Sequence, residues 1–191
     1  GTYSNGNLTT VMNSASGQFT FGTLAVSQGK WYWESKFETD NDDIVVGISR
    51  AEYDPNDSTY NRSITYRAFN GSLLVGGVGT GGTGNASYGN SYAAGDIIGV
   101  AFDADNGVIW FSKNGTWQNS ATIAEIEAGT TTNSATTGIT MNQYWFPLIE
   151  GSGSGTKYSF NFGNGYFGTS QVSSANSDTA GIGEFEYEVP D

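Results

Sequence analysis

One acidic stretch of this chain has the spacing of part of a metal site. Asp103-x-Asp105-Asn106-Gly107 places oxygen-bearing side chains on alternate residues ahead of a glycine, as in half of a calcium-binding loop. The downstream acidic ligand is missing, because residues 112–115 contain no carboxylate. Asn106-Gly107 also suits a chain reversal. The pattern therefore favours a turn and predicts no metal, although calcium binding by Asp103 and Asp105 stays open.

Catalytic chemistry has few candidates in this sequence. It contains no cysteine and no histidine, so the thiol nucleophile and the commonest general base are both missing. A carboxylate pair about 5 to 9 Å apart, as in glycoside hydrolysis, could come from Glu34, Glu38, Asp96 or Glu150. The glycine-rich residues 76–84 lack the Gly-Lys-Ser/Thr ending of a phosphate-binding loop. We therefore expect a protein that is not an enzyme and uses no cofactor.

Aromatic residues in or beside the predicted loops are better candidates for a binding site. Tyrosine and tryptophan offer a large contact area at a small cost in side-chain entropy, so recognition surfaces use them often. The aromatic residues in such positions are Tyr53, Tyr60, Tyr66, Phe69, Tyr88, Tyr92, Trp117 and Tyr144. The ligand-binding residues that we predict are Tyr53, Tyr60, Tyr66, Arg67, Phe69, Asn70 and Trp117. For any single aromatic residue, the competing interpretation is that it packs a loop onto the core.

The charge balance excludes some partners. Seven basic and 19 acidic side chains give a formal net charge of −12. Such a surface repels phosphate backbones and anionic lipid headgroups, so we expect neither nucleic-acid binding nor membrane binding. No apolar run approaches the roughly 20 residues that span a bilayer, and no signal peptide is recognisable. Solubility is the simplest role for the charge.

The elements that must position these residues are short strands. Residues 100–102 and 108–111 are apolar runs that flank Asn106-Gly107, and Asn114-Gly115 follows. Asn-Gly pairs tolerate the positive φ angles of a type I′ turn, so two tight hairpin reversals are predicted here. In residues 30–38, aromatic and polar residues alternate with a period of two, which predicts one buried face and one solvent-exposed face.

The rest of the chain continues this pattern. Further strands are predicted over residues 7–12, 19–26, 44–49, 63–69, 72–75, 145–150 and 158–162, with a helical turn within 121–129. Residues 184–189 alternate Phe185, Tyr187 and Val189 with glutamates, so they form either an added strand or a connection to a following segment. Because the chain begins at Gly1, we expect a processed product or a segment of a longer polypeptide.

Five motifs in a fixed order point to a known family. The central one covers residues 95–115, Gly-Asp-Ile-Ile-Gly-Val-Ala-Phe-Asp-Ala-Asp-Asn-Gly-Val-Ile-Trp-Phe-Ser-Lys-Asn-Gly. Ahead of it stand Gly29-Lys30-Trp31-Tyr32-Trp33-Glu34 and Val46-Gly47-Ile48-Ser49. After it come Trp145-Phe146-Pro147-Leu148-Ile149 and Phe160-Asn161-Phe162-Gly163. Together they resemble the SPRY domain, over about residues 5 to 165.

The resemblance implies an all-β fold: a bent antiparallel β-sandwich of the concanavalin or jelly-roll type. It implies a SPRY-type domain over residues 1–165, with 166–191 as a C-terminal extension or added strand. SPRY domains generally bind proteins through loops at one edge of the sandwich. Carried onto this chain, that surface would combine residues 50–60, 66–70 and 151–156. The last of these, Gly-Ser-Gly-Ser-Gly-Thr, lacks the aromatic residue that several eukaryotic members have there.

The composition, rich in Gly, Ser, Thr and Asn, differs from that of animal SPRY domains, and two segments, residues 4–9 (Ser-Asn-Gly-Asn-Leu-Thr) and 27–34 (Ser-x-Gly-Lys-Trp-Tyr-Trp-Glu), resemble SPRY-like domains in bacteriophage structural proteins, including tail and fibre components. We therefore expect a virion-surface or extracellular protein that recognises a host-surface protein or glycan and contacts other virion proteins. A structural decoration role, with the Phe185/Tyr187/Val189 strand as interface, and a less favoured carbohydrate-active enzyme are the alternatives. A homo-oligomer formed through a longer parent protein stays open.

Overall fold

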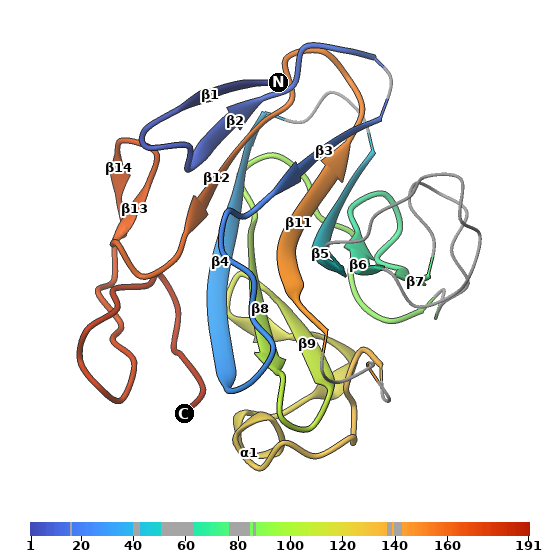
Figure 1. Cartoon of the computed structure of the whole chain (residues 1–191), viewed down its shortest axis with the longest axis vertical. Coiled ribbons are helices and arrows are strands. Elements are labelled where there is room, and N and C mark those ends of the chain that lie inside the picture. Colours follow the sequence, from blue (N-terminus) through green and yellow to red (C-terminus); the bar gives the residue numbers. More distant parts are fainter. Residues whose placement is uncertain are drawn as a thin grey trace.

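The structure, a computed structural model, consists of two packed antiparallel sheets and confirms the predicted all-β sandwich (Figure 1). It describes residues 1–15, 17–39, 43–50, 63–76, 85, 87–136, 139 and 143–191. One sheet has seven strands in the order β1-β2-β12-β4-β8-β9-β10, and the other has five in the order β3-β11-β5-β6-β7. A two-stranded hairpin, β13-β14, is hydrogen-bonded to neither sheet, and its Phe167 packs against Ile97 of the seven-stranded sheet.

The strands and helices have the following bounds, given in chain order. The strands of the first half are β1 (Thr2–Ser4), β2 (Thr9–Val11), β3 (Gln18–Phe21), β4 (Lys30–Thr39), β5 (Ile44–Arg50), β6 (Ser63–Arg67) and β7 (Leu73–Val75). The central elements are β8 (Ile97–Asp103), β9 (Val108–Lys113), β10 (Thr116–Trp117), the 3₁₀ turn η2 (Gln118–Ser120) and the helix α1 (Ile123–Glu127). The last strands are β11 (Trp145–Gly151), β12 (Lys157–Asn161), β13 (Tyr166–Phe167) and β14 (Ser170–Gln171). No helix in the described part of the chain has the length and apolar character that crossing a membrane requires.

Strand β4 shows how the alternating pattern builds the core, and where the prediction is wrong. Trp33 and Phe37 point between the sheets and are buried, as predicted. The opposite face was expected to be solvated, but Glu34 is fully buried and Tyr32 packs against a second apolar cluster. The cause is tertiary: residues 184–187 of the C-terminal segment lie over this face, where Phe185 contacts the Tyr32 ring.

The central hairpin has the predicted pairing but only one of the two predicted tight turns. Val100 lies opposite Phe111, and Lys113 pairs with Thr116 around Asn114-Gly115. Both turn residues there have positive φ, as a type I′ turn requires. The first reversal is a four-residue loop, because Asp103 pairs with Val108 and its carboxylate accepts two backbone N–H bonds within the loop. A side-chain cap thus replaces the two-residue turn.

The C-terminal region does not add a strand to either sheet. Glu184 and Phe185 form only isolated bridges, to Asn164 and Asn176. Phe185 is buried, so the predicted Phe185/Tyr187/Val189 interface is wrong in its first residue: that side chain packs within the domain instead. The predicted helical turn is confirmed as α1, whose start is fixed by a capping box between Thr122 and Glu125.

Candidate functional site

The exposed turn after β6 brings three of the predicted binding residues together. The Arg67 guanidinium pairs with the Asp43 carboxylate, with Nε and Nη2 each 2.5 Å from Oδ2. It also lies 5.6 Å from the centroid of the Phe69 ring. Phe69 is 74% exposed, and the following residue, Asn70, is exposed as well. We call Asp43, Arg67, Phe69 and Asn70 the turn edge.

The backbone of the turn edge is held from two sides. Ala68 N–H donates to Ile44 O at 2.8 Å, and the Asn70 side-chain oxygen accepts from Ser72 N–H at 3.1 Å. Gly71 has a φ of +71°, and an added Cβ would lie 2.0 Å from Gly89 O. Only glycine therefore allows the turn to approach the neighbouring segment so closely. An exposed phenylalanine on such a fixed backbone loses little further freedom when it binds.

Two predicted site residues lie in the interior. Tyr66 is fully buried, and its ring packs against Tyr88, Tyr92 and Phe111. Burial raises the pKa of its phenol well above the ordinary value. Trp117 is also buried, in the cluster on the outer face of the seven-stranded sheet. Both positions at strand ends were interpreted as loop edges, but packing from distant segments covers them.

The other predicted residues divide between two ends of the five-stranded sheet. Val45 lies opposite Arg67, and Ile44 lies opposite Gly151, so the turn edge and the 151–156 turn share one end. Arg50 lies opposite Trp145 at the other end. Of the surface expected from residues 50–60, 66–70 and 151–156, the last two segments thus share one end, and Arg50 lies at the opposite end. The remaining residues of the first segment, 51–60, lie outside the described residues. Tyr53 and Tyr60 lie outside the described residues.

The acids considered for catalysis have structural partners instead. Glu34 accepts hydrogen bonds from Glu186 N–H and Tyr187 N–H, both at 2.9 Å, and from the Tyr32 hydroxyl and Asn161 side-chain amide. Burial raises the pKa of Glu34, and these hydrogen bonds oppose the rise without cancelling it. Glu150 lies in β11 of the other sheet. Glu34 and Glu150 thus belong to different layers of the sandwich.

Two further acids are held by lysines. Glu38 accepts from Lys157 and Ser159, and Asp96 lies 3.0 Å from the Lys113 ammonium. Partial burial would raise the pKa of each acid, but the hydrogen bonds outweigh it and lower both pKa values.

The suspected calcium loop also uses its acids internally. The Asp103 carboxylate accepts from Asp105 N–H, Asn106 N–H and the Asn106 side chain, and Asp105 accepts from Gly29 N–H at 2.9 Å. Within the described residues, no group of three or more acidic side chains is placed to hold a metal ion. The loop geometry is that of a capped turn.

Asp43 is the member of the turn edge that the sequence analysis missed. An Asp-rich connection ahead of a strand looks like solvated loop when the strand pairing is unknown. The signal was indirect: if residues 44–49 pair with residues 63–67, the acid before the first strand meets the basic residue at the end of the second. Opposite charges at such positions stabilise antiparallel pairs.

Comparison with known proteins gives a consistent result. A family model described as SPRY domain matches residues 30–165. Among solved structures, the crystal structure of the SPRY domain of human HERC1 matches with a TM-score of 0.60 and 21% sequence identity, covering 80% of this chain and 87% of that chain. At this identity the likeness concerns the fold. No curated protein sequence matches the chain.

Proposed function

Because this chain belongs to the SPRY domain family, whose members are generally protein-binding modules, we propose that it is a non-enzymatic recognition module that binds through the turn edge. The observation that carries the proposal is Phe69, a large apolar side chain that is 74% exposed on a backbone fixed by Ala68 and Gly71. Large aromatic and arginine side chains are enriched among residues that dominate binding energy.

The Arg67–Asp43 pair defines what such a partner must supply. Arg67 is already neutralised by Asp43 and lies against the Phe69 ring, so it supports the ring without presenting a free charge. The partner would therefore bury Phe69 and hydrogen-bond to the exposed amide of Asn70. Both a protein surface and the apolar face of a sugar ring meet these requirements.

The biological setting that we propose is the surface of a bacteriophage virion, with a host-surface protein or glycan as the ligand. The support is the sequence: the resemblance to phage tail and fibre domains and the strongly acidic composition, which suits a protein exposed to solvent. A rigid sandwich with exposed turns fits this task, because binding residues at turns can change without disturbing the core.

The test is binding of the labelled chain to a glycan array and to a panel of bacterial cells. Phe69→Ala should weaken binding about tenfold or more, since truncating a dominant interface residue removes about 2 kcal/mol. Leu24→Ala is the matched control, because Leu24 is 81% exposed and lies outside the turn edge. Binding that survives the combined Arg67→Ala and Phe69→Ala changes contradicts the proposed surface. Assembly onto virions without any binding to cells contradicts the recognition role.

A further inference from the structure

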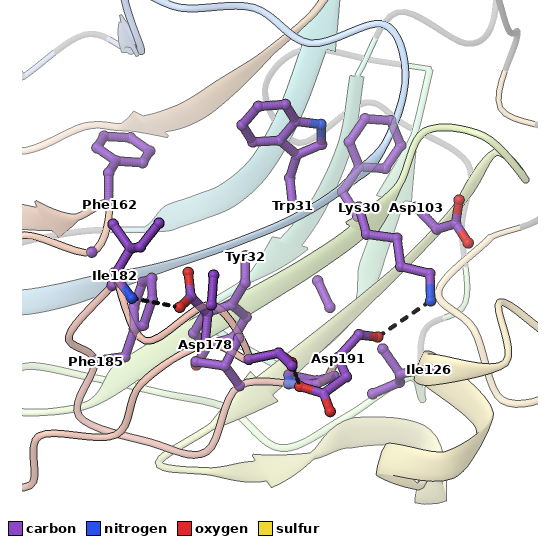
Figure 2. Close-up of a pocket in the computed structure, with 18 of the residues that line it drawn as sticks. Lys30, Trp31, Tyr32, Asp103, Ile126, Phe162, Asp178, Ile182, Phe185 and Asp191 are labelled. Atoms are coloured by element: carbon purple, nitrogen blue, oxygen red, sulfur yellow. Dashed lines mark hydrogen bonds between the residues drawn. The ribbon is translucent and has the colours of Figure 1, made fainter.

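A groove of about 460 Å³ lies far from the turn edge, on the outer face of the seven-stranded sheet (Figure 2). Its floor is apolar, formed by Tyr32, Ala101, Trp110 and Ile126, and residues 178–191 form the facing wall. This volume lies within the range of sites that bind small ligands or parts of larger ones. The C-terminal segment covers part of the sheet with Phe185 and leaves the rest of this face hollow.

Exposed apolar side chains gather at the margin of the groove. Ile182 is 82% exposed, and Trp31 and Phe162 are 47% and 44% exposed. In Figure 2, Ile182 lies on the C-terminal segment, whereas the Trp31 side chain leaves β4 on the side away from Asp178 and Asp191. A monomer seldom leaves so many large apolar side chains around one hollow unless something covers them.

A polar group in the floor lacks its partner. Trp110 is fully buried, and its indole N–H has no acceptor among the residues that the structure describes. Leaving a buried donor unpaired costs about 1–3 kcal/mol. The Trp110 ring lines the groove, so its indole N–H signal reports on what occupies the floor.

The charges around the groove are mostly negative. Asp103, Asp178 and Asp191 line it, and within the described residues no ion pair compensates them. Lys30 also lines it, but its ammonium donates to two backbone carbonyls, Glu127 O at 2.7 Å and Asp191 O at 3.2 Å. With a net charge of −12 on the whole chain, a cationic partner is favoured here.

We propose that this groove binds an extended polypeptide segment in which a large apolar residue is flanked by lysine or arginine. Such a segment supplies an apolar side chain for the floor and cations for the acidic margin. The groove is a second surface, and the proposal is independent of ligand binding at the turn edge.

The experiment is a titration of the isotope-labelled chain with the capped peptide Gly-Lys-Leu-Lys-Gly, followed by the indole N–H signals in NMR spectra. The Trp110 indole signal should move and saturate. The peptide Gly-Lys-Gly-Lys-Gly, without the apolar residue, and the charge-reversed peptide Gly-Glu-Leu-Glu-Gly should leave it unchanged. Equal or tighter binding of the charge-reversed peptide overturns the proposal.

Variants locate the binding. Ile182→Ala should weaken it roughly three- to tenfold through lost apolar contact, and Asp178→Asn roughly two- to fivefold through lost charge attraction. Ala101→Leu should abolish peptide binding by filling the floor of the groove. If this change unfolds the chain, Ile182→Ala and Asp178→Asn still test the proposal. Leu24→Ala, at an equally exposed residue outside the groove, should have no effect.

Other occupants give different results. Maltohexaose that shifts the Trp110 signal when no peptide does identifies a carbohydrate site and overturns the proposal. A dimer in sedimentation that dissociates on Ile182→Ala identifies a second copy of this chain as the occupant and overturns it as well.

Discussion

The turn edge and the C-terminal segment each combine a carboxylate with a phenylalanine, but one phenylalanine ring is exposed and the other is buried. At each, a carboxylate holds a group from a distant part of the chain: Asp43 pairs with Arg67, and Glu34 accepts the backbone N–H groups of residues 186 and 187. Each also carries a phenylalanine. Phe185 is buried against Tyr32, whereas Phe69 is 74% exposed.

The difference lies in what covers the aromatic ring. Phe185 belongs to a segment that covers part of one face of the sandwich, so its burial contributes to stability. Phe69 stands on a turn that is fixed by hydrogen bonds below it while nothing in the described residues buries its ring. Exposure of a large apolar group on a rigid backbone is therefore the feature that separates a candidate binding surface from a structural contact in this molecule.

The largest effect should come from Glu34→Gln. The amide nitrogen of glutamine cannot accept a hydrogen bond, so the two donors bonded to the replaced oxygen lose their acceptor, and one of them is the backbone N–H of residue 186 or 187. We expect a loss of about 2–3 kcal/mol in the free energy of unfolding, measured by chemical denaturation, and faster hydrogen exchange at the amides of residues 186 and 187. Glu188→Gln, which changes the same charge at an exposed position, is the control. Unchanged exchange at both amides would show that Glu34 does not hold the segment.

At the turn edge, Gly71→Ala should destabilise the fold more than Gly6→Ala. The two glycines have similar φ angles, +71° and +68°, so the backbone strain is matched. An added Cβ meets Gly89 O at Gly71 and nothing within 4 Å at Gly6. We expect the difference in unfolding free energy to be about 1–3 kcal/mol. Equal losses in thermal denaturation would refute the close approach that fixes the turn.

A smaller effect is expected from Arg67→Ala, about 1 kcal/mol of stability, because the Arg67–Asp43 pair is partly exposed and solvent screens it. Phe69→Ala should change stability by less than about 0.5 kcal/mol, since an exposed ring contributes little to folding. Chemical denaturation of both variants checks the order. If Phe69→Ala proved the more destabilising of the two, the ring would have a structural role and the contrast with Phe185 would disappear.

The smallest effect concerns pH. The pKa of Glu34 is raised in the folded state, so the folded chain binds more protons than the unfolded chain between the ordinary and the raised pKa. This group therefore favours folding more strongly as the pH falls through that window. Glu38 has a lowered pKa and acts oppositely: its stabilisation is lost as the pH falls through the lowered value. Titration of the side-chain carboxyl signals by NMR should give a higher midpoint for Glu34 than for Glu38, and the reverse order would contradict both assignments.

Much of the fold could be predicted because its signals are local. The alternation in β4 places Trp33 and Phe37 in the core, and Asn114-Gly115 fixes a two-residue turn through its φ angles. The strands predicted over residues 63–69 and 72–75 are confirmed by the pairing of β6 with β7. The loop after Asp103 was wrong in detail, because an acid that caps backbone N–H groups competes with the turn preference of Asn106-Gly107.

The candidate site was predicted less well because exposure depends on distant segments. Tyr66 and Phe69 are three residues apart near one strand end, and nothing in their local sequence separates them. Tyr88 and Tyr92 pack against the Tyr66 ring and bury it, whereas the Phe69 ring stays exposed to solvent. Glu34, in an alternating strand, looked solvated until residues 184–187 were placed over it.

The sequence by itself determined where this chain turns and which face of most strands is apolar, since steric limits on φ and period-two alternation act between neighbouring residues. Tertiary structure decided which apolar and charged groups meet water. Burial of Glu34 and Phe185, exposure of Phe69 and the hollow beneath residues 178–191 all depend on contacts between residues far apart in sequence. Those contacts form only when the sheets have packed, and they set the surface that a partner can reach.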